Sequence, residues 1–217
     1  GLAAIYLDAW VLFEYDGYRN IANQTIDYII GNLYDSKAIG FRGSQGAHSD
    51  YYNLSKSERM DLPNPKIDEW CYVNLSAQTA SALFRAYWIL ERPDLLEIGR
   101  LVLDKLVAKS RDNDLFHVFK PESSESHRLM LLCDWASLLN VLMDSHNWDN
   151  SNQNSLPMAV EVASTLVSVF YDKENGGFFD TTEDKNAVGY LKLREKPLPD
   201  NLLAIEGLLK LYNATLD

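Results

Sequence analysis

The chain has 217 residues, 47% of them hydrophobic and 24% charged, and its formal net charge at pH 7 is −11. This composition is ordinary for a globular protein, and the acidic excess argues against a nucleic-acid partner, because phosphate binding needs a basic surface. No apolar run reaches the roughly 18–20 residues that span a bilayer, and Cys71 and Cys133 lack the close spacing of a metal-binding pair. We therefore expect a protein of the reducing cytoplasm without a membrane partner, a metal or a cofactor.

The sequence predicts seven helices, most of them joined in pairs. Their expected bounds are Leu2–Glu14, Tyr18–Leu33, Asn74–Leu90, Pro93–Lys109, Ser126–Asp144, Ser155–Tyr171 and Asp200–Thr215. The connection of residues 34–69 is rich in Gly, Ser, Asp, Asn and Pro, and Pro63 and Pro65 exclude a helix at its end. Pro93 marks a tight stop and restart between two helices, because proline is tolerated in a first helical turn.

One pattern occurs three times along the chain: an amphipathic helix, an acidic turn and a short aromatic run. The helical stretches are Ile21–Ile30, Ile98–Val107 and Ala159–Phe170, and the aromatic runs after them are Phe41, Phe116–Phe119 and Phe178–Phe179. A unit of this size cannot bury its own apolar face, so such repeats stack on one another. We expect the aromatic runs to form short β-hairpins in the loops.

The predicted helices are of two kinds. Residues 75–90, 129–143 and 202–212 are apolar nearly all round, which is typical of helices buried on all sides. In the helix Pro93–Lys109, by contrast, Leu95, Ile98 and Val102 share one face and charged residues occupy the rest. Alternating inner and outer helices predict an all-α fold, an incomplete (α/α) toroid of about three and a half hairpins. The long links should gather at one rim, where function is expected.

Residues 1–217 are expected to form a single (α/α)-hairpin domain. The stretch Gly1–Leu7 has the pattern of the middle of an apolar helix and lacks an N-cap. We therefore expect the chain to be a fragment of a longer protein. An open edge between inner helices would expose a large apolar patch, so we predict self-association or docking against missing hairpins.

Several motifs follow one another in a distinctive order. They are Gly40-Phe41-Arg42-Gly43-Ser44-Gln45, Asn74, Arg92-Pro93-Asp94-Leu95, Gly176-Gly177-Phe178-Phe179-Asp180, Leu193-Arg194-Glu195-Lys196-Pro197 and Asp200-Asn201. On these residues the chain resembles the C-terminal toroid of the spermatogenesis-associated thioredoxin-like proteins, in which a thioredoxin-like domain precedes the toroid. That toroid is similar to six-hairpin glycosidases and N-acylglucosamine 2-epimerases. The resemblance implies a fold more than an activity.

The chain departs from this family at two places on the rim. The family's Ser-Gln-Asp-Ala-Asp run is Ser44-Gln45-Gly46-Ala47-His48 in this sequence, and its Asp-Trp-Asn is Tyr72-Val73-Asn74. Both changes remove carboxylates, which lowers the expectation of catalysis. The motif residues predicted to contact a ligand are Gln45, Asn74, Phe178, Arg194, Lys196 and Asn201.

Glycoside hydrolysis needs two carboxylates, one of them protonated. Asp134 lies inside an apolar helix, so it must be paired or have a raised pKa. Asp180 follows two phenylalanines on which a sugar could stack, although it could equally accept backbone N–H groups in a turn. For Asp200 we favour the role of N-cap of the last helix over catalysis.

Epimerisation needs two bases on opposite faces of a sugar. His117 and His127 could converge on one cavity, whereas His48 and His146 belong to other loops. The catalytic candidates are thus Asp134, Asp180 and His117. The sequence favours a module that binds a small polar or sugar-like ligand at the rim. An active sugar hydrolase or epimerase, and a purely structural assembly domain, are the alternatives.

Overall fold

The computed structural model describes residues 1–46, 49–111, 115, 117–119, 130–184 and 187–217. The long helices of these residues are α1 (Leu2–Phe13), α2 (Asp16–Leu33), α5 (Val73–Leu90), α6 (Pro93–Arg111), α7 (Leu132–Trp148), α8 (Ser155–Phe170) and α9 (Leu198–Thr215). The short elements are α3 (Ser49–Asn53), α4 (Lys56–Met60), the strands β1 (Cys71–Tyr72) and β2 (Val118–Phe119), and a 3₁₀ helix (Gly189–Lys192).

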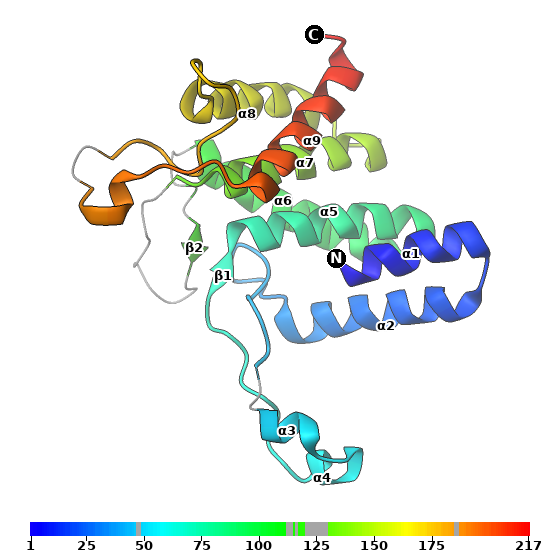
Figure 1. Cartoon of the computed structure of the whole chain (residues 1–217). Helices are drawn as coiled ribbons and strands as arrows, with labels where there is room; N and C mark the ends of the chain where they lie inside the picture. The colour runs from blue at the N-terminus through cyan, green and yellow to red at the C-terminus, as the bar shows by residue number, and fades with distance from the viewer. Residues whose placement is uncertain (47–48, 112–114, 116, 120–129, 185–186) are drawn as a thin grey trace.

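The long helices form an open arc of two layers (Figure 1). The inner layer runs in the order α1, α5, α7, α9, and α7 packs against both α5 and α9. The helices α2, α6 and α8 each pack against the inner helix that precedes them in the sequence. This arrangement confirms the predicted all-α fold, an incomplete (α/α) toroid. Three hairpins and a single inner helix make up the described part of the arc.

The long connections lie at one end of the arc and the short ones at the other (Figure 1). At the rim, β1 pairs with β2 in antiparallel register. This pairing joins the first long link, between α2 and α5, to the second, between α6 and α7. The third long link lies between α8 and α9. Isolated bridges between Tyr34 and Phe41 and between Tyr171 and Phe178 close turns within the first and third links. The expected strand structure in the loops is therefore present. It also connects one link to the next, which fixes the N-terminal ends of the inner helices.

Several elements differ from the sequence prediction. The third inner helix is Leu132–Trp148, whereas the prediction was Ser126–Asp144, of which residues 126–129 lie outside the described part of the chain. The last helix begins at Leu198 with Pro197 as its N-cap, and Pro199 lies in its first turn, where the fixed φ of proline is tolerated. The connection of residues 34–69 contains α3 and α4, which were not predicted, and α4 begins with a capping box formed by Ser55 and Glu58.

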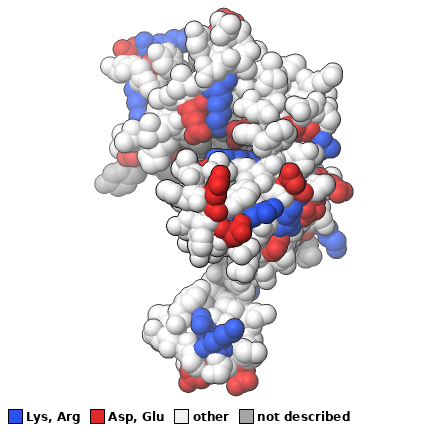
Figure 2. All heavy atoms as spheres, turned by 90° about the vertical axis from the view of Figure 1, so that its right-hand side faces the viewer, with Lys and Arg blue, Asp and Glu red and all other residues white. Residues whose placement is uncertain are grey.

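The α3–α4 segment projects from the body of the molecule in both views (Figures 1 and 2). Figure 2 shows the end with the short connections, where acidic and basic side chains lie side by side. In the described part of the chain, no helix is both long enough and apolar enough to cross a membrane.

The prediction that the inner helices are apolar all round is wrong for one face. On α5, Gln78, Ser81 and Arg85 recur at helical spacing, and together with Asn140 and Asp144 of α7 they line the concave side of the arc. The remaining faces of α7 are packed between α5, α8 and α9, so this helix is the most buried in the arc. The polar residues of α5 and α7 therefore face the concave side of the arc.

Candidate functional site

The predicted catalytic residues His117 and Asp134 form a pair at the rim. His117 lies just before β2, and its carbonyl oxygen accepts a hydrogen bond from the backbone N–H of Val73, 3.0 Å away. Asp134 lies in the first turn of α7. The Nδ1 atom of His117 is 3.0 and 3.1 Å from the two carboxylate oxygens of Asp134. The carboxylate is fully buried, whereas 28% of the histidine side chain is exposed.

The surroundings of this pair raise the pKa values of both groups. The hydrogen bond from Asp134 raises the pKa of His117 above its ordinary value, against the opposing effect of burial. Burial raises the pKa of Asp134, and the hydrogen bond with His117 opposes that rise. The backbone N–H of Asn74 donates a further hydrogen bond to Asp134, at 3.1 Å. The pair therefore retains a proton to a higher pH than the isolated groups would.

Asp200 lies near enough to Asp134 and Asp180 for their charges to act on it. Burial raises the pKa of Asp200, and the negative charges of Asp180 and Asp134 raise it further. Among the described residues, the Asp200 carboxylate has no hydrogen bond or ion pair. The prediction that Asp200 caps α9 is wrong, because Pro197 occupies the N-cap and Asp200 lies within the first turn. Asp200 is thus a part-buried acid without a structural partner in the described structure.

Asp180 has a structural partner. Its side-chain Oδ1 accepts a hydrogen bond from the backbone N–H of Glu195 at 3.0 Å, and its own N–H donates to the carbonyl oxygen of Glu195 at 2.8 Å. Its carbonyl oxygen accepts a hydrogen bond from the N–H of Leu132, also at 2.8 Å. Asp180 does accept a backbone N–H, but the donor is Glu195, 15 residues further along, and not a residue of the predicted turn. Through its hydrogen bond with Leu132, Asp180 connects the third link to the start of α7.

Several predicted ligand-binding residues hold the rim links together. The amide of Gln45 donates to the carbonyl oxygen of Pro65 at 2.8 Å and accepts a hydrogen bond from the hydroxyl of Tyr28. The side chain of Asn201 accepts from the N–H of Phe178 at 2.7 Å and donates to its carbonyl oxygen at 2.9 Å. These two amides therefore stabilise the rim from within.

The basic residues of the third link are also engaged. Lys196 Nζ lies 2.5 Å from Asp172 Oδ2 and 2.6 Å from the carbonyl oxygen of Gly176. The hydrogen bond from Lys196 is the main cause of the lowered pKa of Asp172. The guanidinium of Arg194 lies 3.9 Å from the ring centre of Phe179, a cation–π contact. One face of this aromatic ring is thus occupied by the chain itself.

The other two predicted ligand contacts are partly or wholly internal. Phe178 is buried and packs on Tyr171, with ring centres 5.5 Å apart. The side-chain oxygen of Asn74 accepts a hydrogen bond from the N–H of Leu75 at 2.8 Å. Asn74 lies in the first turn of α5, so its backbone supports the His117–Asp134 pair directly.

The second predicted histidine cannot be placed beside His117, because His127 and His48 lie outside the described residues. His146 lies in the last turn of α7, at the opposite end of that helix from Asp134. His117 is therefore the histidine that the described structure brings to the carboxylates.

His117, Cys133 and Asp134 offer ligand atoms within 4.8 Å of one another. Burial and the charge of Asp134 raise the pKa of the Cys133 thiol, which opposes the thiolate that a metal requires. The expectation of no metal stays a prediction. Spacing along the chain did not reveal this cluster, because His117 precedes the other two residues by a long link.

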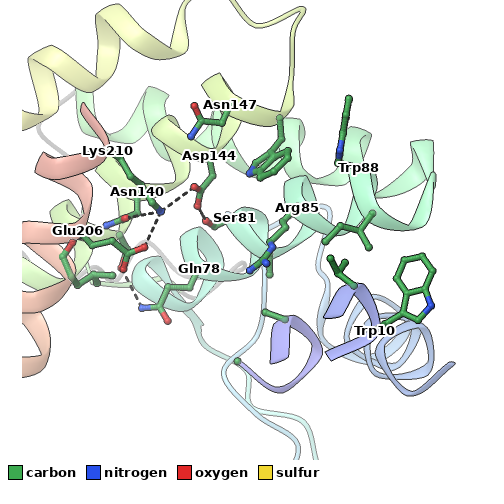
Figure 3. A pocket seen from close by; sticks show the side chains of 18 residues that line it. Trp10, Gln78, Ser81, Arg85, Trp88, Asn140, Asp144, Asn147, Glu206 and Lys210 are labelled. Carbon is green, nitrogen blue, oxygen red and sulfur yellow. Dashed lines mark hydrogen bonds and ion pairs between the residues drawn. The ribbon is translucent and has the colours of Figure 1, made fainter. Parts of the chain in front are cut away.

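A separate cavity of about 880 Å³ lies on the concave side of the arc (Figure 3). Its walls come from α1, α5, α7 and α9. On the side of the cavity formed by α9, Lys210 Nζ is 3.0 Å from Asp144 and 2.9 Å from Glu206 (Figure 3). Burial lowers the pKa of Lys210, but these two carboxylates raise it above its ordinary value. Trp88 is 58% exposed at one side of the cavity.

Sequence reasoning missed this cavity. The polar spacing of Gln78, Ser81 and Arg85 along α5 was the available signal. It was hidden by the high apolar content of the helix. The cavity and the rim cluster are lined by different residues. On α5 the lining of the cavity begins at Gln78, whereas the His117–Asp134 pair contacts the helix one turn earlier, at the backbone N–H of Asn74.

Comparison with solved structures identifies the same architecture in sugar-active enzymes. A GH76 α-mannanase from Bacteroides thetaiotaomicron is 13% identical, with a TM-score of 0.69 over 100% of this chain and 51% of its own. A cellobiose 2-epimerase from Spirochaeta thermophila is 16% identical, with a TM-score of 0.61 over 92% of this chain and 50% of its own. Another, from Bacillus thermoamylovorans, is 13% identical and has a TM-score of 0.58 over 91% and 52%. At these identities the likeness shows the fold, that of six-hairpin glycosidases.

The chain spans about half the length of the structures it matches. No family model matches its sequence, and no curated protein matches it either.

Proposed function

We propose that the chain binds a sugar-like polyhydroxyl ligand at the rim and exchanges protons with it through Asp200 and His117. The observation that carries this proposal is Asp200. A part-buried carboxyl group with a raised pKa and no structural partner among the described residues is suited to act as a general acid. Burial is the main cause of the raised pKa, and the charges of Asp180 and Asp134 add to it.

His117 is the second group suited to proton transfer. Because Nδ1 faces the Asp134 carboxylate, Nε2 is the ring nitrogen left for a substrate. A buried carboxylate that orients an imidazole in this way also stabilises the imidazolium form. The exposed fraction of 28% allows contact with a ligand at the rim. This pairing favours proton abstraction beside a carbonyl group as a second candidate reaction, next to hydrolysis.

The comparisons support the substrate class only through the names of the matched proteins, a mannanase and cellobiose epimerases. We extend the proposal to kinship with the thioredoxin-like family named above and to a cytoplasmic location. Neither point is needed for the chemistry of the rim. A binding test distinguishes the proposed function from a purely structural role.

The binding test uses cellobiose and a β-linked and an α-linked mannobiose as probes, with calorimetry as the measurement. Asp200→Asn should weaken binding by about tenfold, because it removes a hydrogen-bonding acid from the site. Asp104→Asn, an exposed acid on the outer helix α6, is the matched control and should bind like the parent chain. The proposal is contradicted if the parent chain binds none of the three sugars, or if the Asp200→Asn variant binds them as tightly as the parent.

The two reactions are separated by incubating each sugar in heavy water. Epimerisation should place deuterium on the carbon beside the carbonyl, and His117→Asn should abolish that exchange. Hydrolysis should instead release monosaccharide in a reaction that depends on Asp200. Binding without either product identifies a binding module.

A further inference from the structure

The orientation of the His117 ring depends on more than its contact with Asp134. Nδ1 lies almost equally far from the two carboxylate oxygens, at 3.0 and 3.1 Å, so this contact fixes the distance between the two groups. It leaves the ring free to turn about the line that joins Nδ1 to the carboxylate. A second contact is needed to fix the plane of the ring, and with it the direction in which Nε2 points.

Tyr72 supplies such a contact. The ring centres of Tyr72 and His117 are 5.8 Å apart and their planes make an angle of 67°, an edge-to-face arrangement. The pairing of β1 with β2 brings the two residues together, because it places Tyr72 opposite Val118, the neighbour of His117. The backbone N–H of Val73 also donates to the carbonyl oxygen of His117, at 3.0 Å. The main chain and the ring of His117 are thus both held from β1 and the start of α5.

The Tyr72 ring is itself fixed by the first long link. Burial raises the pKa of Tyr72, and the charge of Asp68 and a hydrogen bond to its carboxylate raise it further, so the tyrosine hydroxyl keeps its proton. Asp68 is held in turn, because its Oδ1 accepts the backbone N–H of Trp70 at 3.1 Å. The N–H of Asp68 donates to the carbonyl oxygen of Ser44 at 2.8 Å. The tyrosine is therefore attached at both ends, by its main chain to β2 and by its hydroxyl to the link.

Gly43 makes room for this arrangement. A Cβ atom added at Gly43 would lie 2.5 Å from the Tyr72 ring and 2.7 Å from Asp68 Oδ2. The ring and the carboxylate thus lie against a backbone position that has no side chain, and an alanine there must displace one of them. The same link carries a second glycine, Gly46, where no described atom lies within 4 Å of an added Cβ atom.

We propose that Tyr72 is the positioning residue for His117. Held by Gly43 and Asp68, the tyrosine keeps Nε2 of the imidazole turned toward the rim while Nδ1 stays on Asp134. The chemical use of this arrangement rests on the function proposed above, whereas the arrangement itself can be measured in the chain without a sugar. The first long link, which gives no acid or base to the proposed reaction, then controls the histidine that does.

A space-filling role for Tyr72 is the alternative, and it makes a different prediction. If the tyrosine only fills the gap between the links, its removal lowers stability without changing the histidine. If it positions His117, its removal lets the imidazole turn away from Asp134. The pKa of His117 should then fall toward its ordinary value of about 6.5. Greater exposure to water acts in the opposite direction, but the hydrogen bond from Asp134 is the larger effect.

The test is nuclear magnetic resonance of the 217-residue chain without ligand, with the histidine ring nitrogens labelled. His117 is assigned among the four histidines by the signal that is lost in His117→Asn. Tyr72→Leu should lower the pKa of His117 and should move the proton of the neutral ring from Nδ1, where Asp134 holds it, to a mixture of the two nitrogens. Tyr171→Leu removes a tyrosine of the third link that packs on Phe178. It is the control and should change neither property.

A pair of glycine variants tests the proposal without changing the tyrosine. Gly43→Ala should displace Tyr72 and shift the His117 pKa and proton in the same direction, whereas Gly46→Ala should leave both as in the parent chain. Tyr72→Phe, which keeps the ring but frees it from Asp68, should give a smaller shift of the same sign. Circular dichroism identifies the variants that keep their helices. An unchanged His117 in the folded variants at positions 43 and 72 overturns the proposal.

The same variants relate this arrangement to the proposed reaction. If the parent chain incorporates deuterium into a sugar in heavy water, Tyr72→Leu should slow that exchange by about tenfold to a hundredfold through kcat. Sugar binding should change little, because the tyrosine acts on His117 and not on the sugar. Exchange at the parent rate in Tyr72→Leu contradicts the proposal. If the parent chain exchanges no deuterium, the proposed epimerisation fails, and the resonance measurements still determine the role of Tyr72.

Discussion

At the scale of single residues, the His117–Asp134 pair combines two effects that act on one proton. Burial of Asp134 disfavours its charge, and the same carboxylate stabilises a protonated His117. The network is completed by the backbone N–H of Asn74. A buried acceptor that loses its donor is costly, so His117 should matter for stability as well as for chemistry.

Replacing His117 by Ala should lower the free energy of unfolding by about 3 kcal/mol at pH 6, because it breaks a buried pair. The pKa of His117 is higher in the folded chain than in the unfolded one. Its contribution is therefore complete below the unfolded pKa of about 6.5 and is lost as the pH rises through the folded pKa. Urea unfolding at several pH values should show the difference between the two chains shrinking toward alkaline pH.

The control for this measurement is the same substitution made together with Asp134→Asn. With the carboxylate gone, removal of the imidazole should cost much less and the pH dependence should flatten. An equal loss at every pH in the parent background would show that His117 acts by packing alone.

At the scale of elements, the repeat and the apolar periodicity predicted every long helix, because both depend on local spacing. They did not predict the features that depend on tertiary packing. Pro197 and Pro199 place the start of α9 ahead of Asp200, so the predicted cap became a part-buried acid. The polar residues of the inner helices were overlooked because average apolarity does not show which face meets water.

The candidate site was predictable to a similar degree. Asp134 stood out as a charge within an apolar helix, and the structure gives it the partner that such a charge needs. The identity of that partner depends on the pairing of β1 with β2, which brings His117 to the start of α5. No spacing along the sequence encodes that contact.

Close packing between α9 and α7 gives a prediction at Gly207. A Cβ atom at this position would lie 2.9 Å from Leu139 and 3.0 Å from the side chain of Asn140. Gly207→Ala should destabilise the fold by about 1 kcal/mol, since the cost of overpacking exceeds the gain in helix propensity. Thermal or urea unfolding measures the difference.

Gly31 on α2 provides the matched comparison, because nothing lies within 4 Å of a Cβ atom added there. Gly31→Ala should stabilise the chain by up to about 1 kcal/mol through helix propensity alone. If both substitutions stabilise equally, α9 does not approach α7 as closely as the structure indicates.

At the scale of the whole molecule, the arc presents a polar concave side between two apolar edges. Stability of such a shape depends on what covers the edges, because the inner helices at the ends bury only part of their apolar surface. Self-association through these edges, as predicted from the sequence, would link folding to association.

This linkage predicts that the thermal unfolding midpoint of the chain rises with its concentration, since a partner that binds only the folded form stabilises it by mass action. Calorimetry over a range of concentration of about a hundredfold should show a steady increase. In a variant that joins Ile5→Lys with Leu12→Lys, which changes two exposed apolar residues of α1, the midpoint should be lower and independent of concentration. A midpoint of the parent chain that does not move with concentration would mean that the edges are stable in water, and that the open arc folds as a monomer.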